Sequence, residues 1–182
     1  MGFTPLEGLV MSTRCGSIDP ALVTYLMKHD ESLQTPAAMD EIMYHKSGFL
    51  GLSGGESHDM KTLEQSKAST DALAALAIES FMHVLVKQVS SYVGVLRGVD
   101  TLCFGGGIGE HAHIVRRELI STLASFLPIE LDVAKNAHAK GTVRISTDAS
   151  KIEVWVVAVD EGAIMVRDAL KLTQPEGLQS QL

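Results

Sequence analysis

Apolar residues recur at intervals of three and four along most of this chain, which is the spacing of one face of an α-helix. The longest such stretch covers residues 68–96 and is followed by Gly98, a residue type that commonly ends helices. A shorter stretch opens at Asp19-Pro20, a capping side chain followed by proline, and another opens in the same way at residues 35–36. The pattern predicts helices over residues 20–29, 36–46, 59–64, 68–96, 114–126 and 160–170.

Three segments are rich in β-branched and apolar residues and predict strands over residues 99–104, 142–146 and 153–159. The last is a nearly continuous apolar run, which suits a buried strand of a parallel sheet. Residues 48–56 are rich in glycine and serine and predict a loop, and residues 174–182 predict a polar tail. Helices that alternate with buried strands indicate an α/β fold, here a single domain over residues 1–182.

The composition is that of a soluble globular protein, with 46% hydrophobic and 20% charged residues among 182. A net charge of −7, with no basic cluster longer than Arg116-Arg117, argues against a nucleic-acid partner. No apolar run approaches the roughly 18 residues of a membrane helix, and residues 2–5 do not resemble a signal peptide. Because Cys15 and Cys103 form no disulfide framework, we expect a cytoplasmic protein with reduced thiols.

The run at residues 103–110, Cys-Phe-Gly-Gly-Gly-Ile-Gly-Glu, is the most informative local feature. It follows a predicted strand and leads into a predicted helix. Bare backbone in such a turn can approach a nucleotide, because a Cβ would block both the turn and the approach. Tight strand-to-helix turns also use glycines for steric reasons alone, so the run leaves both interpretations open.

Two further segments change that balance. Residues 1–20 read Met-Gly-Phe-Thr-Pro-Leu-Glu-Gly-Leu-Val-Met-Ser-Thr-Arg-Cys-Gly-Ser-Ile-Asp-Pro, and residues 156–161 read Val-Val-Ala-Val-Asp-Glu. Together with the glycine run, and in the same order and spacing, they resemble the signature of the acetate kinase family, which includes propionate and butyrate kinases. The resemblance covers the chain from end to end.

The resemblance implies a fold as well as an activity. It implies the C-terminal lobe of an actin-like ATPase or sugar-kinase-like (ribonuclease H-like) fold, truncated at its N-terminal strands. Family members are roughly twice as long, so the N-terminal lobe and a glycine-rich phosphate-contacting segment have no counterpart here. We therefore expect the sheet to end on an unprotected edge. A homodimer is also implied.

The resemblance makes Arg14 the catalytic arginine, which neutralises the transferring phosphoryl group in the transition state. The chemistry suits the residue, because a planar guanidinium fits the oxygens of a phosphoryl group. The alternative is a surface arginine that pairs with a carboxylate such as Asp19. Pro5 resembles a proline in the pocket for the methyl group of the carboxylate substrate, and its alternative is an ordinary loop proline.

Two segments resemble the family's adenosine site. Asp59 is positioned to accept hydrogen bonds from the ribose hydroxyls, although it also suits the start of a helix. Lys61 stands where the family has arginine, and His111 stands where the family usually has asparagine. Glu110 also suits a helix start electrostatically. The nucleotide-binding residues implied are Asp59, Met60, Lys61, Gly106, Gly107, Ile108, Gly109 and Glu110.

Glu161 resembles the family glutamate of the Mg²⁺ (or Mn²⁺) site, and a carboxylate oxygen is a suitable ligand for a hard cation. Its alternative is a carboxylate at a helix start. The seven histidines are expected to form no site.

The activity implied is reversible phosphoryl transfer from ATP to acetate, giving acetyl phosphate and ADP. This chain would carry the adenosine-binding half and be inactive alone. Two alternatives stay open: a catalytically inactive nucleotide-binding or dimerisation module, and part of a propionate or butyrate kinase. The partners expected are an adenine nucleotide and a short carboxylate, with neither nucleic acid nor a membrane.

Overall fold

The computed structural model describes residues 2–68 and 71–173. Its helices are α1 (Pro20–His29), α2 (Pro36–His45), α3 (Gly48–Leu52), α4 (Met60–Ala68), α5 (Ala72–Leu96), α6 (Gly106–His111), α7 (His113–Leu123), α8 (Val133–Ala137) and α9 (Glu161–Thr173), with a short 3₁₀ turn, η1 (Glu31–Leu33). Its strands are β1 (Thr101–Phe104), β2 (Val143–Arg144) and β3 (Glu153–Val156). The predicted polar tail at residues 174–182 lies outside the described residues.

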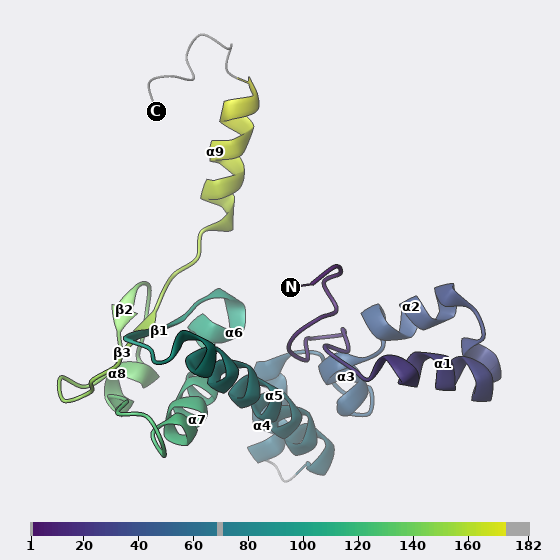
Figure 1. Ribbon diagram of the computed structural model, residues 1–182, viewed down its shortest axis with the longest axis horizontal. Coiled ribbons are helices and arrows are strands. Elements are labelled where there is room, and N and C mark those ends of the chain that lie inside the picture. Colours follow the sequence, from purple (N-terminus) through teal and green to yellow (C-terminus); the bar gives the residue numbers. More distant parts are fainter. Residues whose placement is uncertain (1, 69–70, 174–182) are drawn as a thin grey trace.

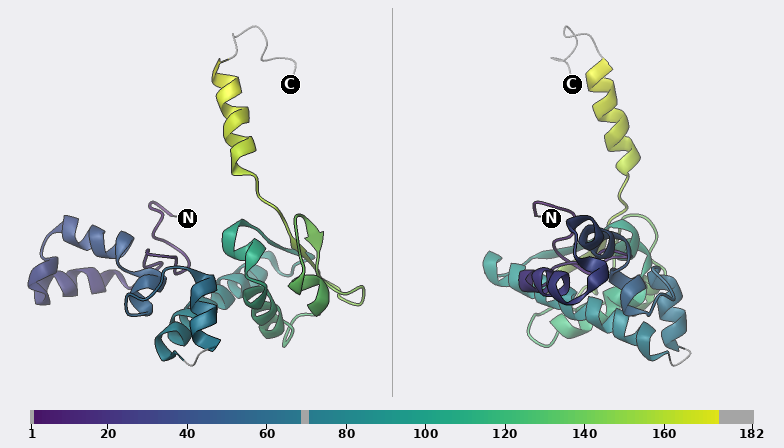
Figure 2. Two further views of the ribbon diagram at one scale, coloured as in Figure 1. Left: turned by 180° about the vertical axis from the view of Figure 1, so that it is seen from behind. Right: turned by 90° about the vertical axis from the view of Figure 1, so that its right-hand side faces the viewer.

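The elements form an elongated body from which one helix stands away (Figure 1). The small sheet and helices α6 to α8 lie at one end, and the pair α1 and α2 lies at the other. The long helix α5 runs between the two ends. All the views in Figures 1 and 2 show α9 clear of this body.

The three strands lie in the order β1-β3-β2. The central strand β3 is parallel to β1, with Val154 opposite Leu102, and antiparallel to β2, with Val156 opposite Val143. Both valines are buried, as the continuous apolar run predicts. Strands alternating with helices confirm the α/β expectation. Among the described strands nothing pairs with the outer edge of β1, which agrees with the expected unprotected edge.

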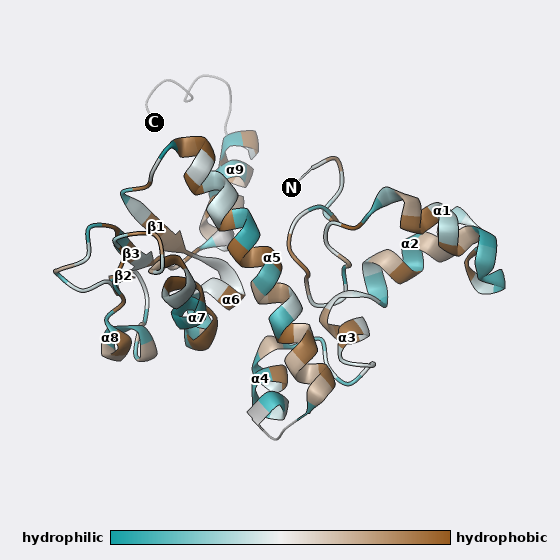
Figure 3. Ribbon diagram, turned by 60° about the horizontal axis from the view of Figure 1, so that its bottom comes forward, coloured by the Kyte–Doolittle hydropathy of each residue, from teal (hydrophilic) through white to brown (hydrophobic). Residues whose placement is uncertain are grey.

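Helices α5 and α7 pack against each other beside the sheet and supply much of the core. The hydropathy view shows hydrophobic and hydrophilic residues alternating along α5 (Figure 3). By length and composition α5 could cross a membrane, which corrects the expectation that no run is long enough. Core helices pass the same test, and α5 packs on α3, α4 and α7. Phe81 on α5 is buried, with its ring 5.5 Å from that of Phe49.

One prediction is wrong for a long-range reason. Residues 48–56 were expected to form a loop, but residues 48–52 form α3. The carbonyl oxygens of Met11 and Ser12 accept hydrogen bonds from the first amides of α3, at 2.8 and 3.0 Å. Gly48 has φ of 63°, and a Cβ there would lie 2.9 Å from the Arg14 nitrogen. Helix α3 therefore depends on hydrogen bonds to a segment distant in sequence. That segment passes so close to the start of α3 that residue 48 must be glycine.

The helix expected over residues 114–126 is confirmed as α7, which begins at residue 113 and ends at residue 123, but the glycine run before it does not form the expected turn. The run itself is helical from Gly106, and α6 ends where Ala112 adopts φ −89° and ψ 80°, which an α-helix cannot continue. Helix α7 begins at the next residue. Helix α8 was not expected, although Asp132 caps it in the usual way by accepting a hydrogen bond from the Lys135 nitrogen. The helix expected over residues 59–64 extends to residue 68, and the last predicted strand ends earlier, at residue 156.

Candidate functional site

A cavity of about 820 Å³ lies beside the glycine run, where α4, α6 and the start of α7 meet. It brings together two segments that the sequence marks as nucleotide-binding but that lie almost fifty residues apart. Cavities of this size are typical of small-molecule sites. The residues that line it are Ser12, Phe49, His58, Asp59, Met60, Lys61, Glu64, Gln65, Gly107, Ile108, His111, Ala112, His113 and Ile114.

The glycines of the run serve different purposes. A Cβ added at Gly107 would meet no atom within 4 Å, so the backbone there faces open space and lines the cavity. A Cβ at Gly109 would lie 3.3 Å from the carbonyl carbon of Phe104, which is tight packing between α6 and β1. Gly106 has φ of 72°, a conformation that favours glycine. The two explanations of the run therefore apply to different positions.

Glu110 holds the run in place through its carboxylate. One oxygen, Oε1, accepts hydrogen bonds from the backbone nitrogens of Gly106 and Val159, both at 3.1 Å. These bonds join the start of α6 to the segment that follows β3. Glu110 does not line the cavity, unlike Gly107 and Ile108. Its carboxylate thus fixes the backbone around the cavity.

The segment at residues 59–61 also lines the cavity, at the start of α4. Asp59 caps α4, because its Oδ2 accepts hydrogen bonds from the Thr62 nitrogen and the Thr62 hydroxyl, both at 2.9 Å. These bonds lower the pKa of the Asp59 carboxyl, the backbone bond most of all. The side chain of Met60 is buried in the core, whereas Lys61 is exposed at the cavity rim. The alternative of a helix-start carboxylate at Asp59 is confirmed.

Several cavity residues were missed by the sequence interpretation. His58, His111 and His113 line it, although the histidines were expected to form no site. Their neighbours gave the only signal, since the first precedes Asp59 and the others follow the glycine run. Within the described part of the chain, no three His, Cys, Asp or Glu side chains are grouped to hold a metal ion.

Glu64 is another lining residue that was missed. Burial raises the pKa of its carboxyl above the ordinary value, and the nearby carboxylate of Glu118 raises it further. Its Oε1 is buried without a hydrogen-bond partner among the residues that the structure describes. The cavity wall therefore includes a carboxyl group that is costly to ionise.

Arg14 lies in the irregular segment whose backbone accepts hydrogen bonds from α3, two residues after the lining residue Ser12. Its backbone is held by the bond from the Met11 nitrogen to the Arg14 carbonyl, at 3.2 Å. In the described ranges its guanidinium makes no hydrogen bond or ion pair, and the side chain is exposed. The Asp19 carboxylate instead caps α1 through the Ala21 nitrogen, at 2.9 Å. The alternative pairing with Asp19 is therefore not formed.

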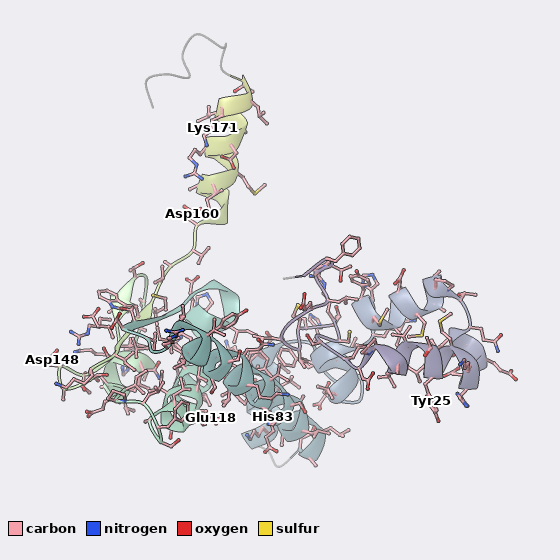
Figure 4. The ribbon with its side chains drawn as sticks, in the orientation of Figure 1. Tyr25, His83, Glu118, Asp148, Asp160 and Lys171 are labelled. Carbon is pink, nitrogen blue, oxygen red and sulfur yellow. The ribbon has the colours of Figure 1, made fainter. Side chains whose placement is uncertain are left out.

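Two expected site residues are not brought to the cavity. Pro5 is half-buried in the N-terminal turn and is not among the lining residues. Glu161 is the first residue of α9, and its side chain lies outside what the structure describes. Its neighbour Asp160 lies at the foot of α9 (Figure 4), where its Oδ1 accepts a hydrogen bond from the Ala163 nitrogen at 2.9 Å.

Comparison with solved structures identifies the proteins that share this fold. The crystal structure of Porphyromonas gingivalis acetate kinase matches with a TM-score of 0.85 and 33% identity, over 96% of this chain and 43% of that one. A propionate kinase from Francisella tularensis matches with a TM-score of 0.77 and 38% identity, over 88% of this chain and 40% of that one. The fold is therefore that of part of such a kinase, an α/β fold consistent with a truncated actin-like ATPase.

Comparison of the amino-acid sequence identifies the family to which the chain belongs. The profile of the Acetokinase family matches residues 1–167. The acetate kinase of Streptococcus pneumoniae (strain ATCC 700669 / Spain 23F-1) is 40% identical over 172 residues, which are 94% of this chain and 43% of that protein. This chain belongs to the acetokinase family, and it spans less than half the length of the curated relatives it matches.

Proposed function

We propose that this chain carries the nucleotide-binding part of a kinase that transfers a phosphoryl group from ATP to acetate, giving acetyl phosphate and ADP. The observation that carries the proposal is the shared cavity of residues 58–61 and residues 107–108, two segments that resemble the family's adenosine site. Membership of the acetokinase family supports the reaction. Propionate or butyrate as acceptor is an alternative, and the likeness to a propionate kinase supports the first of these.

The cavity suits an adenosine by its chemistry. Ile108 and Ile114 line the cavity, are only half-buried and offer apolar surface to a base, and the Gly107 backbone allows close approach. The Asp59 carboxylate, whose pKa is lowered by its bonds to Thr62, would accept hydrogen bonds from ribose hydroxyls. Lys61 brings a positive charge to the rim, where phosphates would leave the cavity. The nucleotide would then extend toward the segment that carries Arg14.

Arg14 would act on the transferring group. Phosphoryl transfer depends on positive charge placed around the phosphoryl oxygens as the transition state forms. A guanidinium without an internal partner can be offered to those oxygens, and Arg14 has none among the described residues. Pro5 would contact the methyl group of the acceptor.

In this proposal the metal ion, Mg²⁺ or Mn²⁺, binds together with the nucleotide. The described side chains offer no three-residue cluster, but Mg²⁺ commonly binds through substrate phosphates with one or two carboxylates. Glu161 would supply one such carboxylate oxygen to Mg²⁺ or Mn²⁺. The metal would neutralise phosphate charge.

The second candidate is a nucleotide-binding or dimerisation module without turnover. The chain covers 43% of the length of its acetate kinase relative. The 182 residues by themselves would then bind nucleotide weakly and make no acetyl phosphate. We further propose a homodimer in the cytoplasm, with neither nucleic acid nor membrane as partner.

Calorimetric titration with Mg-ADP tests the binding site. We expect saturable binding no tighter than about 1 mM, roughly 4 kcal/mol. Gly107→Val should abolish it, because the new side chain would enter the cavity without meeting protein atoms. Gly94→Val is the matched control, since a Cβ there also meets nothing within 4 Å but lies on α5, away from the cavity. Equal binding by the wild type and Gly107→Val would refute this location.

A further inference from the structure

Arg116 on α7 is an unusual core residue. It is only 1% exposed, and burial lowers the pKa of its guanidinium. Its Nε donates to Asn136 Oδ1 and its Nη2 to the Asn136 carbonyl, both at 2.8 Å. Its Nη1 donates to the carbonyls of Gly109 and Glu110, again at 2.8 Å. All four bonds go to neutral carbonyl oxygens.

The two α6 carbonyls explain why a buried cation is useful here. They belong to the last turn of the helix, where carbonyls lack partners within the helix and carry partial negative charge. Helix α6 is short, and three of its six residues are glycine. Glycine disfavours the helical state, and helices this short are not stable by themselves. The conformation of α6 therefore depends on contacts from outside it.

Arg116 is in turn fixed by α8. Asn136 is 1% exposed, and its Nδ2 donates to the His113 carbonyl at 2.9 Å. One asparagine thus binds the guanidinium and the first turn of α7 together. At the other end of α6, Glu110 binds the Gly106 nitrogen, so the helix is held at both ends.

We propose that Arg116, oriented by Asn136, is a positioning residue for the nucleotide site, which holds α6 so that the backbone of Gly107 and Ile108 faces the cavity. Arg116 itself is not among the cavity-lining residues and would touch no ligand. The proposal rests on the proposed function for its consequence in binding. The positioning of α6 can be measured without any nucleotide.

The first measurement is amide hydrogen exchange of the free protein. In Arg116→Met, exchange of the amides in α6 should accelerate about tenfold or more, because several carbonyls lose their donor. The amides of β3 should keep their protection. Arg117→Met is the matched control, since that arginine is the next residue on α7 and is exposed. Unchanged exchange in α6, or equal acceleration in α6 and β3, would overturn the positioning role.

Arg116→Lys keeps the charge and serves if the methionine variant does not fold. A single ammonium cannot reproduce four donors directed at two helices. It should therefore also accelerate exchange in α6, by less than methionine does. Protection of α6 equal to the wild type in Arg116→Lys would show that charge alone is sufficient and would overturn the proposed geometry.

The second measurement is Mg-ADP affinity at a temperature where circular dichroism shows each variant fully folded. Arg116→Met should weaken binding at least about tenfold, and Arg117→Met should leave it unchanged. A purely structural arginine would lower the melting temperature without changing this affinity, which would contradict the proposal. If the wild type does not bind Mg-ADP, the proposed function fails, and the exchange experiment still decides the positioning role.

Discussion

Helices α7 and α9 carry similar sequence patterns and lie in very different surroundings. Both alternate apolar and polar residues with helical spacing. Helix α7 buries Val115, Leu119, Ile120 and Leu123 against the core. Helix α9 is two residues longer, yet its large apolar side chains are all exposed, namely Ile164, Met165, Val166, Leu170 and Leu172. Figures 1 and 2 show it clear of the body.

The contrast shows what a sequence pattern can and cannot predict. An apolar stripe predicts a helix with one apolar face, but only the tertiary structure determines which surface packs against that face. An isolated helix of about 13 residues is marginal in water. Helix α7 gains its stability from α5 and the sheet, whereas α9 has no comparable support from the described residues. Substitutions should therefore be costly in α7 and nearly neutral in α9.

The largest expected difference comes from one substitution made in both helices. Leu119→Ala should destabilise the protein by about 2–5 kcal/mol, because Leu119 is 1% exposed and its loss leaves a cavity. Leu170→Ala should cost less than about 0.5 kcal/mol, because Leu170 is 53% exposed. Urea unfolding followed by the fluorescence of Trp155, which lies on β3, measures both.

The same two variants test whether α9 is free of the body in solution. A loss in Leu170→Ala as large as that in Leu119→Ala would mean that α9 packs on the body in solution. Leu170→Ser is a useful companion, since a polar residue should be tolerated on an exposed face but not on a packed one. Sedimentation velocity on the same samples separates packing within one chain from packing between copies.

Local signals allowed several elements to be predicted from the sequence. Asp19 caps α1 and Thr35 caps α2 through bonds to nitrogens two and three residues on, so neighbours in sequence decide where these helices begin. The end of α5 is equally local, because Arg97 adopts a left-handed conformation and Gly98 has φ of 133°.

What could not be predicted depends on contacts between distant residues. Helix α3 needs the carbonyls of Met11 and Ser12, and no pattern within residues 48–52 reveals them. In the candidate site, residue types indicated the glycine run and Asp59. The bond from Val159 to Glu110 spans 49 residues, and that from Arg116 to Asn136 spans 20. These contacts decide which side chains can meet a ligand.

Removal of a helix cap should change the free energy of unfolding by less than Leu119→Ala does. Again the loss should be larger in the core than in α9. Asp71 Oδ1 accepts hydrogen bonds from the nitrogens of Leu73 and Ala74, at 2.8 and 3.1 Å, at the start of the core helix α5. Asp71→Ala should cost about 1 kcal/mol in urea unfolding detected at Trp155. Asp160→Ala removes the corresponding cap of α9 and should lower helical circular dichroism without changing that transition.

An isosteric variant of Asp71 separates the effect of the hydrogen bonds from that of the charge. Asp71→Asn keeps an acceptor oxygen for the α5 amides and should recover most of the loss, which separates the cap hydrogen bonds from the charge. An unchanged transition in Asp71→Ala would show that the start of α5 contributes nothing to the cooperative unit, and the boundary of the stable body would then lie further along the helix.

The smallest effect concerns a carboxyl group that the body half-buries. The pKa of Glu64 is raised, first by burial and then by Glu118, while Arg117 and Lys67 partly oppose the shift and Asp59 adds to it. The unfolded chain releases this proton near pH 4.5, and the folded protein releases it at higher pH. Because the folded state holds the proton longer, stability falls as pH rises from about 4.5 through the folded pKa.

Glu64→Gln should remove that fall and raise stability at pH 7, by ~0.5 kcal/mol or less, since the side chain is only half-buried. Asp168→Asn on α9 also removes one negative charge, but Asp168 is exposed and pairs with Lys171 at 3.2 Å. It should leave the pH dependence of the Trp155 transition as it is in the wild type. Urea midpoints measured between pH 4 and pH 8 compare the two variants. A wild-type profile parallel to that of Glu64→Gln, or a loss of stability in Glu64→Gln at pH 7, would show that burial in the body does not penalise this carboxylate.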